Sequence, residues 1–237
     1  MGRTSASALL LLFLLITFVN AYHARQMAKR VITIPTPSPA EVNRYLQKWD
    51  SLENYVWQEE ALDKLFFDIC PDNTDMNDIL IKVATLNDFY STYIYNIFAM
   101  AKHIQSLDID SRLRRGDASL VEEIASVTIK GKAKRFYSFA SKYCSHHKPK
   151  QFPIYDYYVE EVLVYFRKKD KFSTFRRDEL KKYDKFISVL EEFQDYYGLR
   201  AFDKKDLDRY LWQLGKDFFP RNYSTKKKKK GEAPTGE

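Results

Sequence analysis

The residues whose types and spacing point most clearly to chemistry lie between Lys130 and Asp156. Residues 130–150 carry seven positive side chains in 21 residues and no acidic one. These are Lys130, Lys132, Lys134, Arg135, Lys142, Lys148 and Lys150. A dense positive field attracts phosphates, and the carboxylate that follows it, Asp156, can stabilise positive charge on a sugar or take a proton from a nucleophile. The pattern is typical of chemistry on DNA.

Gly131 is predicted to open a helix that runs to about Cys144. A glycine at this point accepts positive φ and leaves the first helical amides free, so that amides and helix dipole together favour a phosphate. We therefore expect the DNA backbone to be bound by Lys130, Gly131, Lys132, Lys134 and Arg135. The alternative is a basic first turn exposed to solvent, which is the commoner outcome for a charge run.

Asp156 and the tyrosines beside it also have two interpretations. An aspartate shortly after Pro153 and near a helix start is most often an N-cap, whereas a catalytic role would require it to face a substrate. Tyr155, Tyr157 and Tyr158 could line a pocket and stack on a flipped base, or they could pack in a core.

Metal and cofactor chemistry finds little support in the sequence. The two cysteines, Cys70 and Cys144, make neither a disulfide framework nor a zinc site. His146 and His147 lie near Cys144, but a four-ligand set needs more partners at defined spacing. We predict no metal and no cofactor, and we expect both histidines on an exposed loop.

The elements that must position these residues are predicted to be helices. Hydrophobic residues make up 45% and charged residues 30% of the chain, which is globular composition, and only 7 Gly and 8 Pro leave little room for the turns of an all-β fold. Hydrophobic periodicity predicts an all-α body of eight or nine helices. The main ones cover residues 39–48, 59–69, 77–104 (with candidate breaks at Asn87 or Ser91), 131–144, 156–166, 178–197 and 204–214, the last ended by Gly215.

The ends of the chain differ from this body. Residues 1–26 resemble a targeting segment, with Arg3 before an apolar stretch and a cleavage-like site at Ala21. Residues 1–21 acting as a signal peptide would make the protein secreted, whereas translation from Met27 would leave it cytoplasmic. We divide the remainder into N-terminal helices over 27–72, a main domain over 73–220 and a basic disordered tail over 221–237.

The net charge of +7 is concentrated at these ends. Residues 226–237 contribute +3 and residues 1–26 contribute +2, which leaves +2 for residues 27–225. Binding of an anion by the body must therefore depend on a local patch rather than on the overall charge.

Two segments together resemble a known family. They are Ile129-Lys130-Gly131-Lys132-Ala133 and, after a predicted helix, Phe152-Pro153-Ile154-Tyr155-Asp156-Tyr157-Tyr158-Val159. They are similar to the helix-hairpin-helix DNA glycosylases, and most similar to the 8-oxoguanine DNA glycosylase branch. The resemblance covers roughly residues 75–219, although the family hairpin carries two glycines and this chain has only Gly131 there.

The resemblance implies a helix-hairpin-helix, glycosylase-like helical body that binds double-stranded DNA and excises a damaged base in base excision repair. Asp156 matches the catalytic aspartate. Members that also cleave the sugar place a nucleophilic lysine shortly after the hairpin glycine, and Lys132 and Lys134 bracket that position while Ala133 occupies it. The alternatives are a noncatalytic DNA-binding module of the same fold and a secreted basic helical protein that binds anionic partners.

Overall fold

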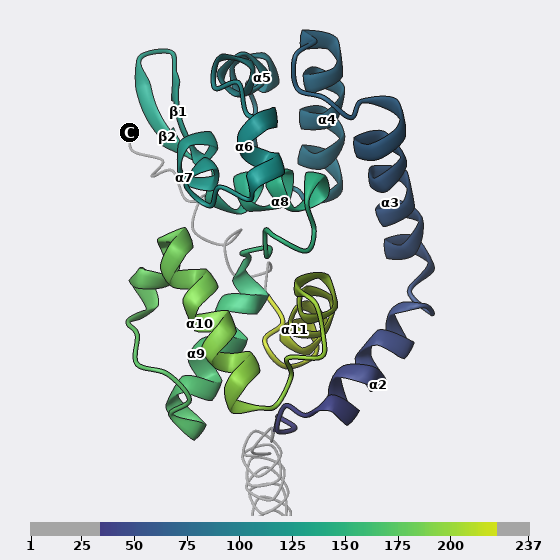
Figure 1. Cartoon of the computed structure of the whole chain (residues 1–237), viewed down its shortest axis with the longest axis vertical. Coiled ribbons are helices and arrows are strands. Elements are labelled where there is room, and N and C mark those ends of the chain that lie inside the picture. The colour runs from purple at the N-terminus through teal and green to yellow at the C-terminus, as the bar shows by residue number, and fades with distance from the viewer. Residues whose placement is uncertain (1–33, 222–237) are drawn as a thin grey trace, which may run out of the picture. The chain divides into compact units, whose positions relative to one another are not determined.

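Ten α-helices account for most of the described chain, residues 34–221 of a computed structural model (Figure 1). The helices are α2 (Pro39–Trp49), α3 (Glu53–Asp63), α4 (Met76–Phe89), α5 (Ile97–Ser106), α6 (Asp110–Arg115), α7 (Ser119–Ala125), α8 (Tyr137–His147), α9 (Tyr157–Asp170), α10 (Tyr183–Tyr196) and α11 (Lys204–Phe218). A π-helical turn η1 (Lys64–Ile69) extends α3, and a 3-10 turn η2 (Arg177–Lys181) precedes α10. The prediction of an all-α fold is confirmed. The targeting segment predicted over residues 1–26 lies outside the described residues, as does the basic tail predicted over 221–237 except for Arg221.

The starts of α2, α4 and α11 follow the capping signals in the sequence. The Ser38 hydroxyl accepts a hydrogen bond from the Glu41 amide at 3.3 Å, with Pro39 in the first helical turn of α2. Asp75 caps α4, and Asp203 caps α11 by accepting from the amides of its first turn. Each cap satisfies an amide that has no partner inside its own helix.

The apolar stretch predicted as one helix over 77–104 is divided into α4 and α5. The Asn87 side chain binds the connecting segment: its amide group donates to the Ile94 carbonyl at 3.3 Å and its oxygen accepts from the Ile94 amide at 2.8 Å. Ser91 and Tyr93 take left-handed backbone conformations, with φ of 48° and 59°. The break is therefore a defined loop that directs residues 90–96 away from the helix axis.

The segment around Gly131 forms a β-hairpin, so the prediction that this glycine opens a helix is wrong. Strands β1 (Ser126–Ile129) and β2 (Lys132–Arg135) pair antiparallel, with Ile129 opposite Lys132. Lys130 and Gly131 form the two-residue turn, with φ of 50° and 72°. Two left-handed residues match the twist of the strands in such turns, and α8 begins only at Tyr137.

Helices α9 and α11 cross closely at Gly215, which does not end the last helix as predicted. A Cβ atom built on Gly215 would lie 2.5 Å from Cβ of Tyr158 and 2.8 Å from its carbonyl oxygen. Only hydrogen at this position lets the two backbones approach so closely. The helix continues to Phe218 because the glycine is a packing residue within it.

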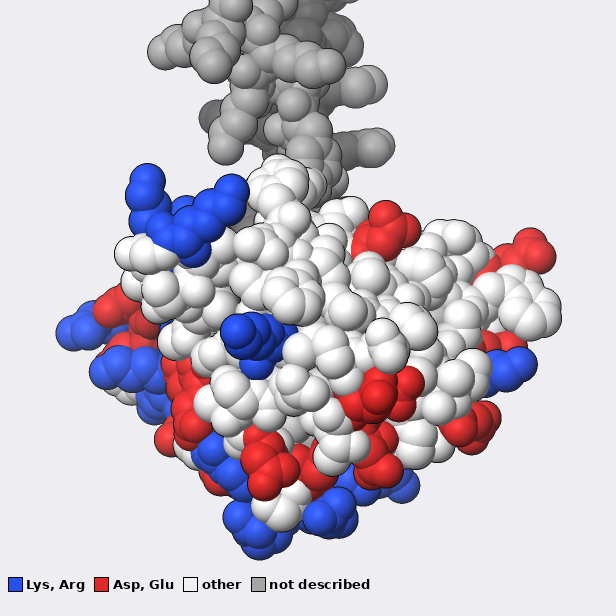
Figure 2. Space-filling model, turned by 90° about the horizontal axis from the view of Figure 1, so that it is seen from above, with Lys and Arg blue, Asp and Glu red and all other residues white. Residues whose placement is uncertain are grey.

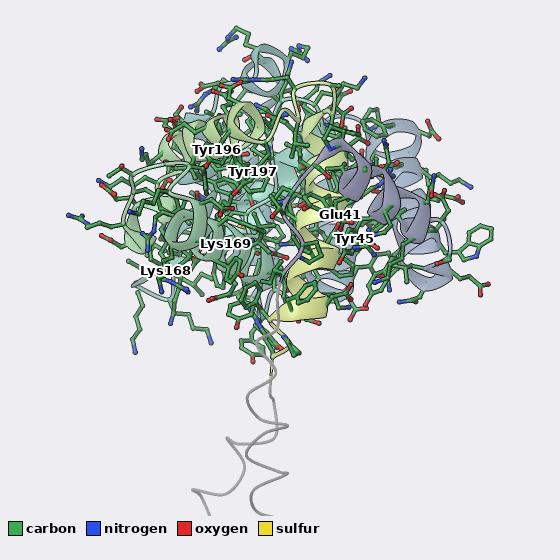
Figure 3. All side chains as sticks on the ribbon, turned by 90° about the horizontal axis from the view of Figure 1, so that it is seen from below. Glu41, Tyr45, Lys168, Lys169, Tyr196 and Tyr197 are labelled. Carbon is green, nitrogen blue, oxygen red and sulfur yellow. The ribbon has the colours of Figure 1, made fainter. Side chains whose placement is uncertain are left out.

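Helix α2 packs along α11 at the end of the molecule seen in Figure 3. The Tyr45 hydroxyl donates to the Asp217 carboxylate at 3.0 Å, and Glu41 lies one turn earlier on the same helix. Lys168 and Lys169 close α9 at this end. None of the helices in residues 34–221 combines the length and apolarity that a membrane crossing requires.

Candidate active site

A cavity of about 750 Å³ opens between α3, the loop after α4, α8, α9 and α11. Its lining combines ionisable side chains with aromatic rings. The residues that matter most for chemistry are Tyr90, Lys142, Asp156, Tyr158, Asp208 and Trp212. A concave site with a few convergent polar groups among aromatic walls is the usual form of a ligand or catalytic site.

Lys142 is the reactive candidate in this cavity. It lies on α8, a helix buried on almost every side, and only 4% of its surface is exposed. Its ammonium nitrogen donates to the Ser138 hydroxyl at 2.7 Å and lies 5.1 Å from the centre of the Tyr90 ring. Burial lowers the pKa of Lys142, and the nearby carboxyl groups of Asp156 and Asp208 only partly oppose this. A fraction of the amine is therefore neutral, and hence nucleophilic, at a lower pH than for an exposed lysine.

Asp156 is an N-cap, which is one of the two interpretations of the sequence, and it also lies in the wall of the cavity. It is the N-cap of α9, and one carboxylate oxygen accepts from the Val159 amide at 2.9 Å. It also lines the cavity and acts on the charge of Lys142. A cap fixes the carboxylate against the helix start, so its position in the cavity does not depend on the substrate.

Asp208 is a second carboxyl group that lines the same cavity. It lies on α11, and within residues 34–221 it makes no hydrogen bond that would compensate an ionised form. Burial, reinforced by the negative charge of Asp156, raises the pKa of Asp208 to about 8. Near neutral pH this carboxyl group therefore carries a proton for most of the time. A carboxyl group that keeps its proton near neutral pH can serve as a general acid.

Aromatic rings form the walls of the cavity. Tyr55 and Trp212 pack edge to face with ring centres 4.8 Å apart, and Trp49 lies 5.9 Å from Trp212. The ammonium of Lys216 lies 4.4 Å from the centre of the Trp212 ring. The guanidinium of Arg221 lies 4.1 Å from the Tyr157 ring. Flat rings with cations beside them suit a planar, electron-rich ligand with an anionic group attached.

The three tyrosines around Asp156 all line the cavity, but they differ in burial. Tyr155 is 8% exposed and packs 4.6 Å from the ring of Tyr137, so it is mainly a core residue. Its hydroxyl donates to Glu160, which also pairs with Arg177. Tyr157 and Tyr158 are half-buried and leave ring surface open to the cavity.

The structure does not bring Lys132 and Lys134 to Asp156. Both lie on β2, whose four residues are all exposed, and neither lines the cavity. Arg135 ends the strand at the cavity wall and is fixed there by bonds to Glu122 and to the Lys181 carbonyl, at 2.7 Å and 2.6 Å. Four lysines line the cavity with Asp156, namely Lys142, Lys181, Lys205 and Lys216. Among them the buried one is Lys142, which lies in the second turn of α8.

The other basic side chains of the hairpin are free of ion pairs. Lys130, Lys132 and Lys134 take part in no salt bridge within the described range 34–221. Space around the tip is open, since a Cβ atom on Gly131 would meet nothing within 4 Å. Figure 2, which views the molecule from above, shows basic side chains gathered at one corner beside a face with few charges.

Lys142 and Asp208 were not identified from the sequence as site residues. For Lys142 a signal existed: it lies between Phe139 and Tyr143 in a segment where almost every position is buried. A lysine inside such a segment needs a functional or pairing reason. For Asp208 no local signal existed, because an acidic residue in an amphipathic helix is normally on its solvent face.

Both histidines are buried, contrary to the exposed loop that we predicted. His146 and His147 belong to α8, and each is 6% exposed. His146 shares a hydrogen bond of 2.9 Å with the Tyr90 hydroxyl, and His147 lies 3.2 Å from the side-chain oxygen of Asn73. Burial lowers the pKa of His146 to about 3 and that of His147 well below its usual value. Both are therefore neutral structural residues near neutral pH.

Within the described range, no three His, Cys, Asp or Glu side chains are placed so that they could hold a metal ion. Cys70 and Cys144 are both free and buried. Burial raises the pKa of the Cys144 thiol, which keeps it protonated and unreactive.

Comparison with known proteins places the chain in a family. A Haemophilus influenzae protein described as uncharacterized is 53% identical over 152 residues, which cover 64% of this chain and 73% of that protein. The model of HI_0787_N, described as an N-terminal domain, matches residues 41–151. The chain belongs to the HI_0787 family. The range matched by the HI_0787_N model includes Lys142 and ends before Asp156. No solved structure matches the chain.

Proposed function

We propose that this member of the HI_0787 family is a DNA N-glycosylase that excises a damaged base from duplex DNA and uses Lys142 as its nucleophile. The observation that carries the proposal is the buried amine of Lys142 in a cavity that it shares with Asp156 and Asp208. Desolvated lysines are the usual source of Schiff-base chemistry with carbonyl-like carbons. The resemblance around Asp156 directs this chemistry to the sugar of a nucleotide.

The site has a residue for each step. The neutral amine of Lys142 attacks C1′ of the damaged nucleoside, and the bond from C1′ to the base breaks with its electron pair going to the base. Asp208, protonated because of its raised pKa, gives its proton to the departing base. The Asp156 carboxylate balances the positive charge on the sugar and accepts a proton from the new ammonium.

A Schiff base follows from that covalent intermediate. The nitrogen lone pair forms a double bond to C1′ as the bond from C1′ to the ring oxygen breaks. The ring oxygen becomes a hydroxyl group by taking the proton that Asp156 accepted in the preceding step. Borohydride reduces this double bond and links the enzyme permanently to DNA. Trapping is therefore a direct readout of the lysine and is separate from base release.

The cavity suits a base turned out of the duplex. Its volume of about 750 Å³ lies within the usual range for small-molecule sites. Trp212 and Tyr158 provide ring faces on which an extruded base can stack. Duplex DNA would be held beside the cavity by the phosphate contacts of Lys130, Lys132 and Lys134, which form no salt bridge with an acidic residue of the range 34–221.

The decisive experiment is borohydride trapping with duplexes that carry oxidised, alkylated or deaminated bases. The wild-type protein should form a covalent adduct with at least one of them. Lys142→Gln should abolish the adduct, whereas Lys132→Gln and Lys134→Gln should each retain it. An adduct that persists in Lys142→Gln would refute the assignment of the nucleophile. Absence of base release and trapping on every lesion would favour a noncatalytic DNA-binding module.

The contribution of the hairpin is tested by the salt dependence of binding. Replacing Lys130, Lys132 and Lys134 by Gln should reduce the slope of log K against log salt by about 2.7, because each lost phosphate contact removes about 0.9. The control variant replaces three lysines at the end of α9, Lys168, Lys169 and Lys171, by Gln. It removes the same charge and should change the slope little. Equal effects of the two triple variants would mean that the hairpin has no special contact with DNA.

A further inference from the structure

The hydroxyl of Ser141 connects the helix that carries Lys142 to the segment that carries Asp156. It accepts a hydrogen bond from the Tyr155 amide at 3.1 Å. The same hydroxyl can donate a hydrogen bond to the Tyr155 carbonyl at 3.3 Å or to the Ser138 carbonyl at 3.1 Å. Ser141 is fully buried, so water cannot replace these bonds.

The position of this connection in the chain makes it relevant to catalysis. Ser141 directly precedes Lys142, and Tyr155 directly precedes Asp156. Residues 148–156, between the two helices, form no helix or strand, and the Tyr183 hydroxyl holds their backbone from α10 by donating to the Pro153 carbonyl at 2.8 Å. The bonds from Ser141 to the backbone of Tyr155 are the hydrogen bonds that join α8 to the start of α9.

We propose that Ser141 is a positioning residue that holds the Asp156 carboxylate opposite the Lys142 amine. This inference rests on the proposed function, since it assumes that both groups act on one substrate. Other contacts hold the Tyr155 side chain, through Tyr137 and Glu160, but they act on the ring and its hydroxyl group. Within the described residues, Ser141 alone bonds a side chain of α8 to the backbone amide of Tyr155.

Ser141→Ala should lower the single-turnover rate of base release and trapping on the order of 10²-fold, since displacement of a reacting group by about 1 Å has effects of that size. The affinity for lesion DNA should change less than about twofold because Ser141 is remote from the hairpin and, being fully buried, cannot touch DNA. Ser141→Cys keeps nearly the same volume with weaker hydrogen bonds. It should fold normally and give an intermediate rate.

Gln194 provides a matched control for loss of stability. Its buried amide holds the segment before α11 by donating to the Phe202 carbonyl at 3.0 Å. Gln194→Met removes a bond from a buried side chain to a non-helical backbone, as Ser141→Ala does, but away from Lys142 and Asp156. This variant should lose stability and keep the rate.

The pH profile provides a readout that a purely structural role would not change. The charged groups that act on Lys142 are Asp156 on α9, Asp208 on α11 and Arg221 after α11. Release of Asp156 from its position removes an interaction that raises the pKa of Lys142. The acidic limb of the trapping rate should therefore move to lower pH in Ser141→Ala.

The outcomes separate the inference from the proposed function. If the wild-type protein shows no trapping, the proposed function fails and the positioning role fails with it. If the wild-type protein traps DNA and Ser141→Ala has the same rate and pH profile as Gln194→Met, only the positioning role is refuted. A loss of rate with a shifted acidic limb in Ser141→Ala, and not in Gln194→Met, is the expected result.

Discussion

Gly215→Ala should destabilise the protein, although alanine is a better helix former than glycine. The added Cβ would lie 2.5 Å from Cβ of Tyr158, 2.8 Å from its carbonyl oxygen and 2.9 Å from its carbonyl carbon. Carbon atoms in contact are normally about 3.5–4.0 Å apart. Two of the three atoms belong to the backbone of α9 and cannot rotate away. The two helices must therefore separate by about 1 Å.

The magnitude follows from two opposing effects. Overpacking of a tight contact costs about 1–3 kcal/mol, and the rigid backbone partner places this site at the upper end, about 3 kcal/mol. The higher helix propensity of alanine than of glycine stabilises the folded protein by about 1 kcal/mol. The net loss of about 2 kcal/mol corresponds to a fall in Tm of about 4–8 °C for a domain of this size.

The assay is urea unfolding and thermal melting of the full chain, with Gly198→Ala as the control. Gly198 has a φ of 66° and no atom within 4 Å of an added Cβ, so only backbone strain of about 1 kcal/mol is expected there. Gly215→Ala should also slow trapping, because α11 carries Asp208 and Trp212 into the cavity. A stability equal to or above that of the wild-type protein would refute the close crossing of α9 and α11.

Three further predictions concern single residues. His146 is neutral and buried, and its pKa is lowered to about 3. The protein should therefore lose stability as pH falls from about 6.5 towards 3. In acid titrations, His146→Gln should reduce the slope of unfolding free energy against pH by about 1.4 kcal/mol per pH unit. Burial lowers the pKa of Lys82 to about 8, so the stability of the wild-type protein should rise as pH increases from about 8 to 10.5. This rise should be absent in Lys82→Met. An unchanged rise in the variant would show that Lys82 is not its source. Asp156→Asn should keep the cap on the Val159 amide and change stability by less than about 1 kcal/mol, while single-turnover assays should show base release reduced by at least about 10²-fold.

The local features of the fold could be predicted because they depend on neighbours in sequence. Ser38 and Pro39 predicted the start of α2. Gly198 predicted the end of α10, and it has a left-handed φ of 66° just after that helix. These signals work because the residues that satisfy a helix end lie within a few positions of it. The cap at Asp156 was recognised for the same reason.

The hairpin shows where local signals are ambiguous. A glycine after a lysine suits both the start of a helix and a two-residue β-turn. The hairpin is favoured by contacts outside the segment: Val127 is buried at 4% exposure, Arg135 reaches Glu122 and the Lys181 carbonyl, and the amide of Phe136 donates to the Ala125 carbonyl at 2.9 Å. Residues 126–135 on their own do not reveal these partners.

The sequence by itself determined the helical class and the starts of α2, α4, α9 and α11, and it predicted Asp156 and its tyrosines as site residues. Only the tertiary structure placed the buried Lys142 in the same cavity as Asp156, because that depends on how α8 and α9 lie against each other and on their joining through Ser141. Asp208 comes to the same cavity from a point 52 residues further along the chain than Asp156. Its proton affinity is set by burial and by the charge of Asp156. The chemical state of a side chain depends on the dielectric and charges around it in space, and the order of residues along the chain does not specify these before the chain has folded.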